Sequence, residues 1–257
     1  MEQLARARIA TWQGGALWLL STRPAGALEP PRTGFHAHHA VQIVFSLGGR
    51  FQLWTADSEA AGPCVAVAPD VPHRFEAEGD YAILFVEPES RAGRGIIGAI
   101  LDGRALRAAS LAVLEGLSDP LSALRPPGAP GRDALTAIGR AMVDRLAGDL
   151  RHPAVDARIE RVIGWVSRSQ DERLTLGSAA EIARLSPSRL SHLFVSETGL
   201  SFKTYLLWTR LTRAVSLMSD GLSLTEAAHG AGFADSAHFS RTFRRMFGIA
   251  PANLKLE

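Results

Sequence analysis

The sequence predicts an α+β protein of two domains, in which an antiparallel β-barrel and the helices that follow it precede an all-helical domain. Segments rich in β-branched and aromatic residues are confined to the first third of the chain, and apolar residues at helical spacing dominate afterwards. The last hundred residues also contain an internal repeat. We place a β-barrel at 1–90, a helical region with a linker at 91–153, and a second domain at 154–257.

Short strand-like segments between Ala16 and about Val86 predict the β-barrel. They read VQIVFSL, RFQLWTA, CVAVAP and YAILFVEP. Turn residues such as Gly48-Gly49 separate them, as is typical of antiparallel sheets with tight connections. A small antiparallel sandwich or barrel follows from this pattern.

The region after Pro88 changes to helical spacing. We predict helices over about Gly93 to Leu117 and over Arg132 to Leu150, separated by a segment rich in proline and glycine that cannot continue a helix. From Asp156, an expected N-cap, the pattern predicts helices to the end of the chain.

Composition excludes several classes of protein. The single cysteine, Cys64, cannot form an intramolecular disulfide, and the N-terminus lacks the order of a secretory signal. The apolar stretches fall short of the roughly 20 residues that span a bilayer. We therefore expect a cytoplasmic protein without a membrane partner. The net charge of +2 permits nucleic-acid binding without indicating it.

The internal repeat is the most informative feature of the sequence. The pattern Thr175-Leu-x-x-Ala-Ala-x-x-Ala recurs as Ser223-Leu-x-x-Ala-Ala-x-x-Ala. Each copy begins with a hydroxyl residue that can cap a helix, and Ser223 with Glu226 predicts a capping box. The small alanines share one helical face, where a second helix can approach closely.

A short turn and another helix follow each copy of the repeat. We predict these helices at about 187–197 and 236–247, with Ser186 and Asp235 as N-caps and Pro187 at the first helical position. Their apolar residues form inward stripes, and their opposite faces are polar or basic. This pattern is typical of recognition helices that enter the major groove of DNA. The polar faces carry Ser188, Arg189, Ser191 and His192 in the first helix, and Ser236, His238, Ser240, Arg241, Arg244 and Arg245 in the second.

The C-terminal half resembles the DNA-binding domain of the AraC/XylS family of bacterial transcription regulators. The resemblance covers roughly Asp156 to Lys255 and rests on GAGFADSAHFSRTFRRMFGIAP and LSPSRLSHLF. It implies two helix-turn-helix units joined by a central helix at about Ser201 to Ser219. It also implies a double-stranded DNA operator and RNA polymerase as partners, and a place on the bacterial nucleoid.

The resemblance also implies which residues contact DNA. Phosphate contacts are expected from Lys203, Arg244, Arg245 and the free N–H groups at helix N-termini, because such contacts hold the register without reading sequence. Ala237 departs from the family pattern, since alanine offers only an apolar contact. The base-reading positions, with Arg189 added from the residue pattern, are Ser188, Arg189, Ser191, His192, Ser236, Ala237, His238, Ser240 and Arg241.

The N-terminal half carries histidines in a pattern that resembles the two cupin motifs. His36, His38 and Gln42 share one face by period-two alternation, and His73 follows in the second motif. In cupins two histidines and a glutamate bind a metal with a later histidine, and Gln42 replaces that glutamate. A neutral amide weakens the case for a hard divalent ion.

Three interpretations of this cluster stay open. A divalent transition metal would use His36, His38 and His73; a metal-free effector pocket would also use Gln42, Phe45 and Trp54; or the histidines are structural. The sequence does not require a cofactor, and the first interpretation would supply a divalent transition metal.

The leading functional hypothesis is a ligand-responsive transcription regulator that is not an enzyme. The family resemblance implies that it activates transcription. Its effector would be a small molecule or a metal, and it would act as a homodimer through the two helices after the barrel, although their stripes could equally pack back on the barrel. The first alternative is a metal-dependent cupin enzyme with a DNA-binding appendage. The second is a constitutive regulator whose barrel only dimerises.

Overall fold

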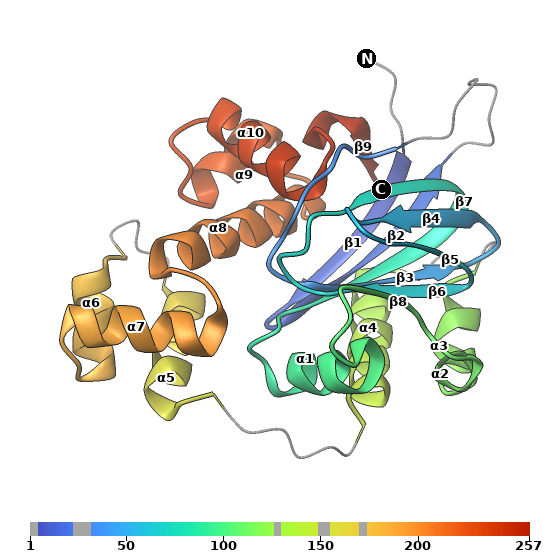
Figure 1. The fold of residues 1–257 in the computed structure, drawn as a ribbon. Helices are drawn as coiled ribbons and strands as arrows, with labels where there is room; N and C mark the ends of the chain where they lie inside the picture. Colours follow the sequence, from blue (N-terminus) through green and yellow to red (C-terminus); the bar gives the residue numbers. More distant parts are fainter. Residues whose placement is uncertain (1–4, 23–31, 126–129, 149–154, 170–173) are drawn as a thin grey trace.

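The computed structural model describes residues 5–22, 32–125, 130–148, 155–169 and 174–257. A β-rich N-terminal half packs beside a helical C-terminal half (Figure 1), so the predicted α+β class is confirmed. The expected boundary near residue 153 lies outside the described residues.

The N-terminal half contains an antiparallel two-layer β structure. The main layer has the strand order β8-β6-β3-β7-β2-β1, and β4 and β5 form the second layer against the first half of β7. The strands are β1 Ala5–Trp12, β2 Gly15–Thr22, β3 Val41–Ser46, β4 Arg50–Trp54, β5 Glu59–Ala61, β6 Cys64–Val67, β7 Arg74–Val86 and β8 Leu106–Ala108.

Strand β7 belongs to both layers because it changes partners at Gly79. Its first residues pair with β4, and from Gly79 onward it pairs with β2 and β3. Gly79 has a φ of +86°, and a Cβ there would lie 2.8 Å from the Cα of Gly49. Only glycine permits this backbone approach, which folds one layer over the other.

The main layer is buried on both faces. Its inner face, with Val44, Val65 and Phe85, packs between the two β layers and against the C-terminal half. Its outer face packs against helices that cover it from below in Figure 1. Cys64 is fully buried on this outer side.

Burial raises the pKa of the Cys64 thiol to about 12, from a usual value of 9.0. A thiol with this pKa holds about 1,000-fold less thiolate at pH 8, and thiolate is the reactive species. We expect the native protein to resist an aromatic disulfide reagent at pH 8. The same reagent should titrate one thiol per chain after unfolding in guanidinium, and rapid reaction of the native protein would contradict the burial.

The region after β7 differs from the single helix predicted over 93–117. Asp102 and Gly103 both have positive φ values, +50° and +76°, and end the helical segment there. The chain then adds β8 to the edge of the main layer beside β6. Because of this break, the region contains α1 Arg91–Ile96, a π-helical turn η1 Ile97–Leu101, β8, α2 Leu111–Glu115 and α3 Ser118–Ala123.

Helix α4, Arg132–Ala147, begins where it was predicted to begin. Its apolar stripe is buried within the chain against β1, β2 and α1. The helix approaches β1 closely at Gly139, where a Cβ would lie 2.4 Å from the Trp12 ring. The stripe that was expected to serve dimerisation is therefore used for packing on the sheet.

The C-terminal half forms two helix-turn-helix units joined by a long central helix. The first unit lies away from the sheet, and the second lies against it (Figure 1). The predicted caps Asp156, Thr175, Ser186, Ser223 and Asp235 are all confirmed as N-caps. The helices are α5 Ala157–Arg168, α6 Leu176–Ala183, α7 Pro187–Thr198, α8 Phe202–Ser219, α9 Leu224–Gly230 and α10 Ser236–Phe247.

The capping box at Ser223 and Glu226 predicts a measurable stability effect. The Ser223 hydroxyl accepts from the Glu226 N–H, and the Glu226 carboxylate accepts from the Ser223 N–H. We expect Ser223→Ala to lower the free energy of unfolding by about 1 kcal/mol. Thr225→Ala is the control, because within the described residues the Thr225 hydroxyl makes no hydrogen bond. Equal loss in both variants in urea denaturation would contradict the cap.

The end of the chain corrects the expectation of helix throughout. Gly248, with a φ of +72°, ends α10, and the chain continues through a 3-10 turn at Pro251–Asn253 into β9, Leu254–Leu256. Strand β9 pairs in parallel with β1. Seven residues after the end of α10, the chain thus joins the N-terminal sheet.

Candidate nucleic-acid interface

The polar face of α7 lies at the surface of the first unit. Ser188, Arg189 and His192 are exposed, and Ser191 is half-buried. Leu190 and Phe194 point the other way into a core shared with α5, α6 and α8. Ser186 begins the helix by accepting from the Arg189 N–H, so the polar residues occupy the first two turns of the helix.

Helix α10 repeats this arrangement in the second unit. Ala237 and Arg241 are exposed, and Phe239 and Phe243 are buried. Asp235 caps the helix by accepting from the His238 N–H, and this hydrogen bond lowers the pKa of Asp235. The remaining polar residues of this face, Ser236, His238 and Ser240, are half-buried.

The basic residues of both units are free to meet a polyanion. Arg244, Arg245 and Lys203 are exposed, as are Arg189 and Arg241. In the part of the chain that the structure describes, none of these five forms an ion pair. Unpaired cations beside a polar helix face are what phosphate contacts require. Base and phosphate contacts by these residues stay predictions.

Aromatic side chains join the second unit to the β structure. Phe247, the last residue of α10, lies 5.0 Å from Trp18 and 5.8 Å from Phe85 between ring centroids. The Trp18 ring also stacks on Phe243 at 6.4 Å. We call this contact, together with the β1–β9 pairing, the interdomain joint.

Polar contacts extend the interdomain joint along α8. Thr11 of β1 donates to the Ser216 hydroxyl at 2.9 Å, and Arg132 of α4 pairs with Asp220. At the other end, the Gly34 N–H donates to the carbonyl oxygen of Gly248 at 3.0 Å. The sequence contains no local signal for these polar contacts, because each of them joins residues that are far apart in the chain.

The histidine cluster lies at the interdomain joint. His36, His38 and His73 are buried, and one possible ligand atom from each lies within 4.8 Å of those of the other two. Burial lowers the pKa of all three, to about 3 for His36, so the rings are neutral. The His38 ring lies 6.0 Å from Phe247 of the C-terminal half.

Two residues expected in an effector pocket lie elsewhere. Phe45 is on the outer face of the main layer beneath the helices, because it alternates with Val44, which faces inward. Trp54 stacks on Arg74 at 4.4 Å, away from the inward-facing Leu53. The pocket predicted around the histidines therefore does not include these two side chains, whereas Gln42 does contact His38.

His39 faces away from the other three histidines. Burial lowers its pKa, but the carboxylates of Asp70, at 2.8 Å, and Glu89, at 3.3 Å, outweigh burial and raise it to about 9. His39 is thus a cation between two carboxylates. This separation agrees with the period-two alternation of the segment.

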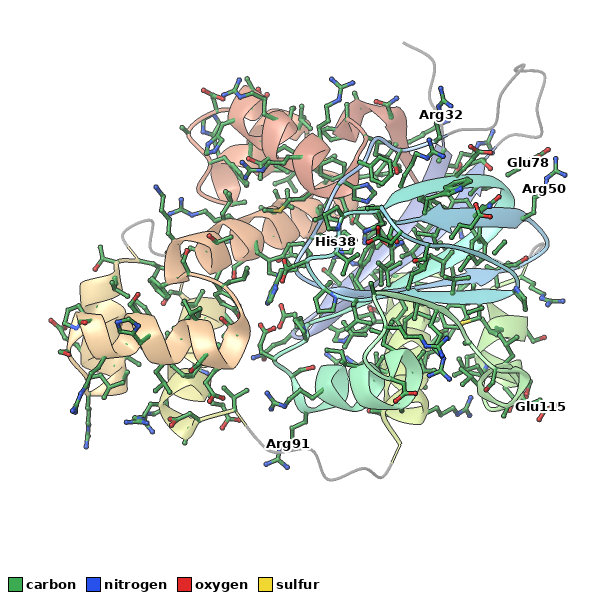
Figure 2. The ribbon with its side chains drawn as sticks, viewed as in Figure 1. Arg32, His38, Arg50, Glu78, Arg91 and Glu115 are labelled. Atoms are coloured by element: carbon green, nitrogen blue, oxygen red, sulfur yellow. The ribbon has the colours of Figure 1, made fainter. Side chains whose placement is uncertain are left out.

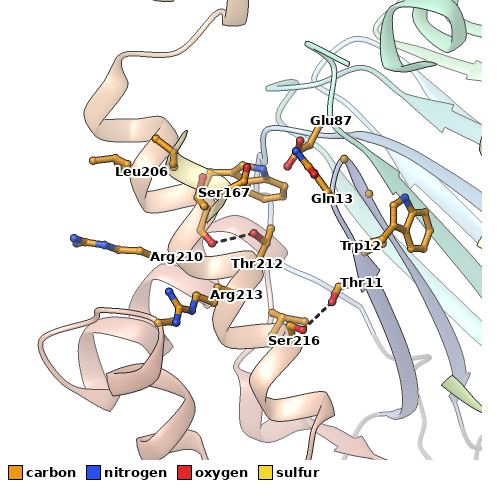
Figure 3. Close-up of a pocket in the computed structure, with 18 of the residues that line it drawn as sticks. Thr11, Trp12, Gln13, Glu87, Ser167, Leu206, Arg210, Thr212, Arg213 and Ser216 are labelled. Carbon is orange, nitrogen blue, oxygen red and sulfur yellow. Dashed lines mark hydrogen bonds between the residues drawn. The ribbon is translucent and has the colours of Figure 1, made fainter. Parts of the chain in front are cut away.

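A cavity of about 530 Å³ lies between the β1–β2 turn and α8 (Figure 3). This volume is in the range of small-molecule sites. Glu87 lines the cavity, and burial together with the carboxylate of Glu89 raises the pKa of Glu87. The lining includes Trp12, Gln13, Glu87, Leu206, Trp208 and Thr212.

Comparison with known proteins finds matches to the C-terminal half of the chain. Residues 179–256 match the model of a helix-turn-helix domain. The chain is 33% identical over 119 residues to the uncharacterized HTH-type transcriptional regulator YpdC of Escherichia coli, covering 46% of this chain and 41% of that protein. It is 31% identical over 106 residues to the arabinose operon regulatory protein of Escherichia coli, covering 40% and 36%.

These matches are partial, since the chain spans less than half the length of the curated relatives. A third, the HTH-type transcriptional activator RhaS of Escherichia fergusonii, is 37% identical over 102 residues, 39% of this chain and 36% of that protein.

The whole fold is similar to solved structures of ToxT from Vibrio cholerae. An apo form has a TM-score of 0.59 at 12% identity, covering 95% of this chain and 97% of that one. A form described as bound to an unsaturated fatty acid has a TM-score of 0.54 at 13% identity, with 96% and 92% covered. At this identity the likeness concerns the two-domain fold. No helix in the described ranges is long and apolar enough to cross a membrane.

Proposed function

We propose that the C-terminal half of this chain is an AraC-type helix-turn-helix domain and that the protein is a sequence-specific DNA-binding transcription regulator. One observation carries the proposal. Helices α7 and α10 each present a polar and basic face at the surface, immediately after an N-cap, with their apolar faces buried. Two such helices on one chain suit successive turns of the major groove.

The residues that would contact DNA follow from this arrangement. Arg189 and Arg241 can each read guanine through two hydrogen bonds, while serine and histidine give more permissive contacts. Lys203, Arg244 and Arg245 would contact phosphates. We assign base reading to Ser188, Arg189, Ser191, His192, Ser236, Ala237, His238, Ser240 and Arg241.

We assign the response of the regulator to a small organic effector that binds in the cavity beside α8. The cavity borders both halves of the chain, so its occupant can favour one arrangement of the interdomain joint over another. Its aromatic lining suits an apolar body, and the side chains of Gln13 and Glu87 suit a hydrogen-bonding end. The ToxT structure bound to an unsaturated fatty acid supports an effector with an apolar body.

A ligand panel tests this effector site. A binder present at 100 times its Kd should add about 2.7 kcal/mol of apparent stability in a thermal-shift assay. Gln13→Ala should weaken the response, and Gln52→Ala, on β4 and outside the cavity lining, should leave it unchanged. Equal responses in the two variants would place the effector elsewhere.

The wider assembly belongs to the same proposal. We propose a homodimer that activates transcription with RNA polymerase on the bacterial nucleoid, in the cytoplasm. The inner stripe of α4 is buried, so the dimer contact would use outward faces of the helices between residues 91 and 148. Sedimentation of the purified protein tests the dimer. The curated relatives are transcription regulators rather than enzymes, and we propose no catalytic activity.

Selection from a random double-stranded DNA pool tests the central proposal. We expect the wild-type chain to enrich a motif of two boxes about one helical turn, roughly 34 Å, apart. The matched control is the double variant Arg189→Ala with Arg241→Ala, which should lose enrichment and retain salt-sensitive binding. Failure of the wild-type chain to enrich any motif, with and without the panel ligands, would overturn the proposal.

A further inference from the structure

Each histidine of the buried cluster uses one ring nitrogen in a hydrogen bond and has one left. The Nδ1–H of His36 donates to the Gly34 carbonyl at 2.9 Å, and the Nδ1–H of His73 donates to the Val71 carbonyl at 2.9 Å. Since a carbonyl oxygen only accepts, these bonds fix the tautomer of both rings. The Nε2 lone pairs of His36 and His73 remain.

His38 is held in the opposite tautomer by Gln42. Its Nε2–H donates to the Gln42 side-chain oxygen at 3.0 Å, which leaves Nδ1 as the acceptor. Gln42 therefore holds a ligand in place rather than serving as one. Such outer hydrogen bonds orient metal-binding histidines in general.

The remaining ring nitrogens of His38 and His73 have no hydrogen-bond donor near them among the described residues. These atoms, His38 Nδ1 and His73 Nε2, are buried. The three rings are 7% exposed or less, and one ring nitrogen of each lies within 4.8 Å of those of the other two. Unpaired buried acceptors are costly, and a cation bound by all three would satisfy them.

The nitrogen-only donor set selects the class of ion. Imidazole nitrogens suit zinc, nickel, copper or iron(II), while magnesium and calcium require oxygen ligands. The neighbouring carboxylates, Asp70 and Glu89, contact His39 instead of this cluster. The residues present therefore fit a divalent transition metal.

The cluster also touches the end of α10. Gly34 connects the two. Its carbonyl oxygen accepts from the His36 ring, and its N–H donates to the carbonyl oxygen of Gly248, the C-cap of α10. A Cβ on Gly248 would lie 2.6 Å from His36 Nδ1, so the ring packs directly on this backbone. His38 lies between Phe85 of the sheet, at 5.2 Å, and Phe247, at 6.0 Å. Figure 2 shows His38 between the sheet and the C-terminal helices.

We propose that a divalent transition metal bound by His36 Nε2, His38 Nδ1 and His73 Nε2 locks the second helix-turn-helix unit onto the β structure. The metal holds the three rings in the orientation on which Gly248 and Phe247 rest. Its occupancy thus controls how firmly α10 is docked. The metal site and the docking of α10 do not depend on the proposed function. Only the effect of the metal on DNA binding rests on it.

Cobalt(II) titration of chelator-treated protein tests the site. We expect one ion per chain, with the visible absorption bands of nitrogen-bound cobalt, displaced by zinc. His73→Gln should abolish these bands, and His192→Gln, on the exposed face of α7, should keep them. Gln42→Leu should lower cobalt affinity about 10- to 100-fold. Equal cobalt binding by wild type and His73→Gln, or none by wild type, would overturn the site and leave a buried water cluster only.

Hydrogen exchange tests the lock. Metal should slow amide exchange at the end of α10 and in β9 of the wild-type chain, and should leave exchange unchanged in His73→Gln. Comparing loaded and chelated wild type keeps the test valid if that variant folds poorly. Stoichiometric binding without slower exchange in these segments would refute the lock.

DNA binding separates this proposal from the function on which it builds. The factor by which metal changes operator affinity must equal the factor by which operator changes metal affinity. If the chelated wild-type chain still enriches a DNA motif and metal leaves its operator affinity unchanged, the coupling is overturned and the proposed regulator function stands. Loss of all motif enrichment with the metal site present would overturn the regulator and leave the lock intact.

Discussion

Phe247→Ala is expected to lower the free energy of unfolding by about 3–5 kcal/mol, the usual cost of truncating a buried phenylalanine. Phe247 is 7% exposed and contacts Trp18, Phe85 and Phe243 with ring centroids 4.7 to 5.8 Å away. Its loss removes apolar contact and leaves a cavity between α10 and the sheet. Urea denaturation followed by tryptophan fluorescence measures the change.

Phe194→Ala is the matched control for this variant. Phe194 is equally aromatic and fully buried, but its neighbours Phe202 and Tyr205 lie at the start of α8 in the core of the first unit. Both variants should lose stability. Only Phe247→Ala should accelerate amide exchange in β9 and its partner β1, because only Phe247 lies in the interdomain joint. A loss below about 1 kcal/mol, or unchanged exchange in β9, would contradict this account of the joint.

Arg241→Ala is expected to weaken operator binding by about 1–3 kcal/mol, or about 5- to 150-fold. Arg241 is exposed on α10, in the second turn after the Asp235 cap, where a recognition helix meets base edges. Removal of its guanidinium should relax the preference at one base pair. Competition binding with operators substituted at each position measures both effects.

Arg245→Ala is the control for base reading. This residue is also exposed on α10, one turn further along, and we assign it to phosphate. Its loss should weaken binding to all sequences alike and reduce the slope of log K against log salt by about 1. If both variants lost only sequence-independent affinity, α10 would not be a recognition helix.

The sequence alone was sufficient for the helices of the C-terminal half. Local signals such as the Ser186 cap with Pro187, and the Ser223 capping box, act within one turn of helix, and the structure begins α7 and α9 at these residues. The candidate DNA-binding residues were predicted for the same reason. A helix with one apolar face exposes the other face wherever it packs.

The region between residues 91 and 117 was mispredicted because its local pattern was ambiguous. The spacing of Ile96, Ile100 and Leu101 is helical, and the structure keeps it helical to that point. The positive φ at Asp102 and Gly103, and the pairing of β8 with β6, depend on a strand about forty residues earlier in the chain. Hydrophobic periodicity contains no information about such a partner.

What this sequence determined by itself was therefore the α+β class, the repeated helix-turn-helix units and the polar faces of α7 and α10, since these depend on neighbours within a few residues. Only the tertiary structure decided the parallel pairing of β9 with β1, the burial of the α4 stripe, and the position of His36 against Gly248. Each of these brings together residues distant in the chain. Their free energy depends on shape and burial across the interdomain joint, which exist only after both halves have folded.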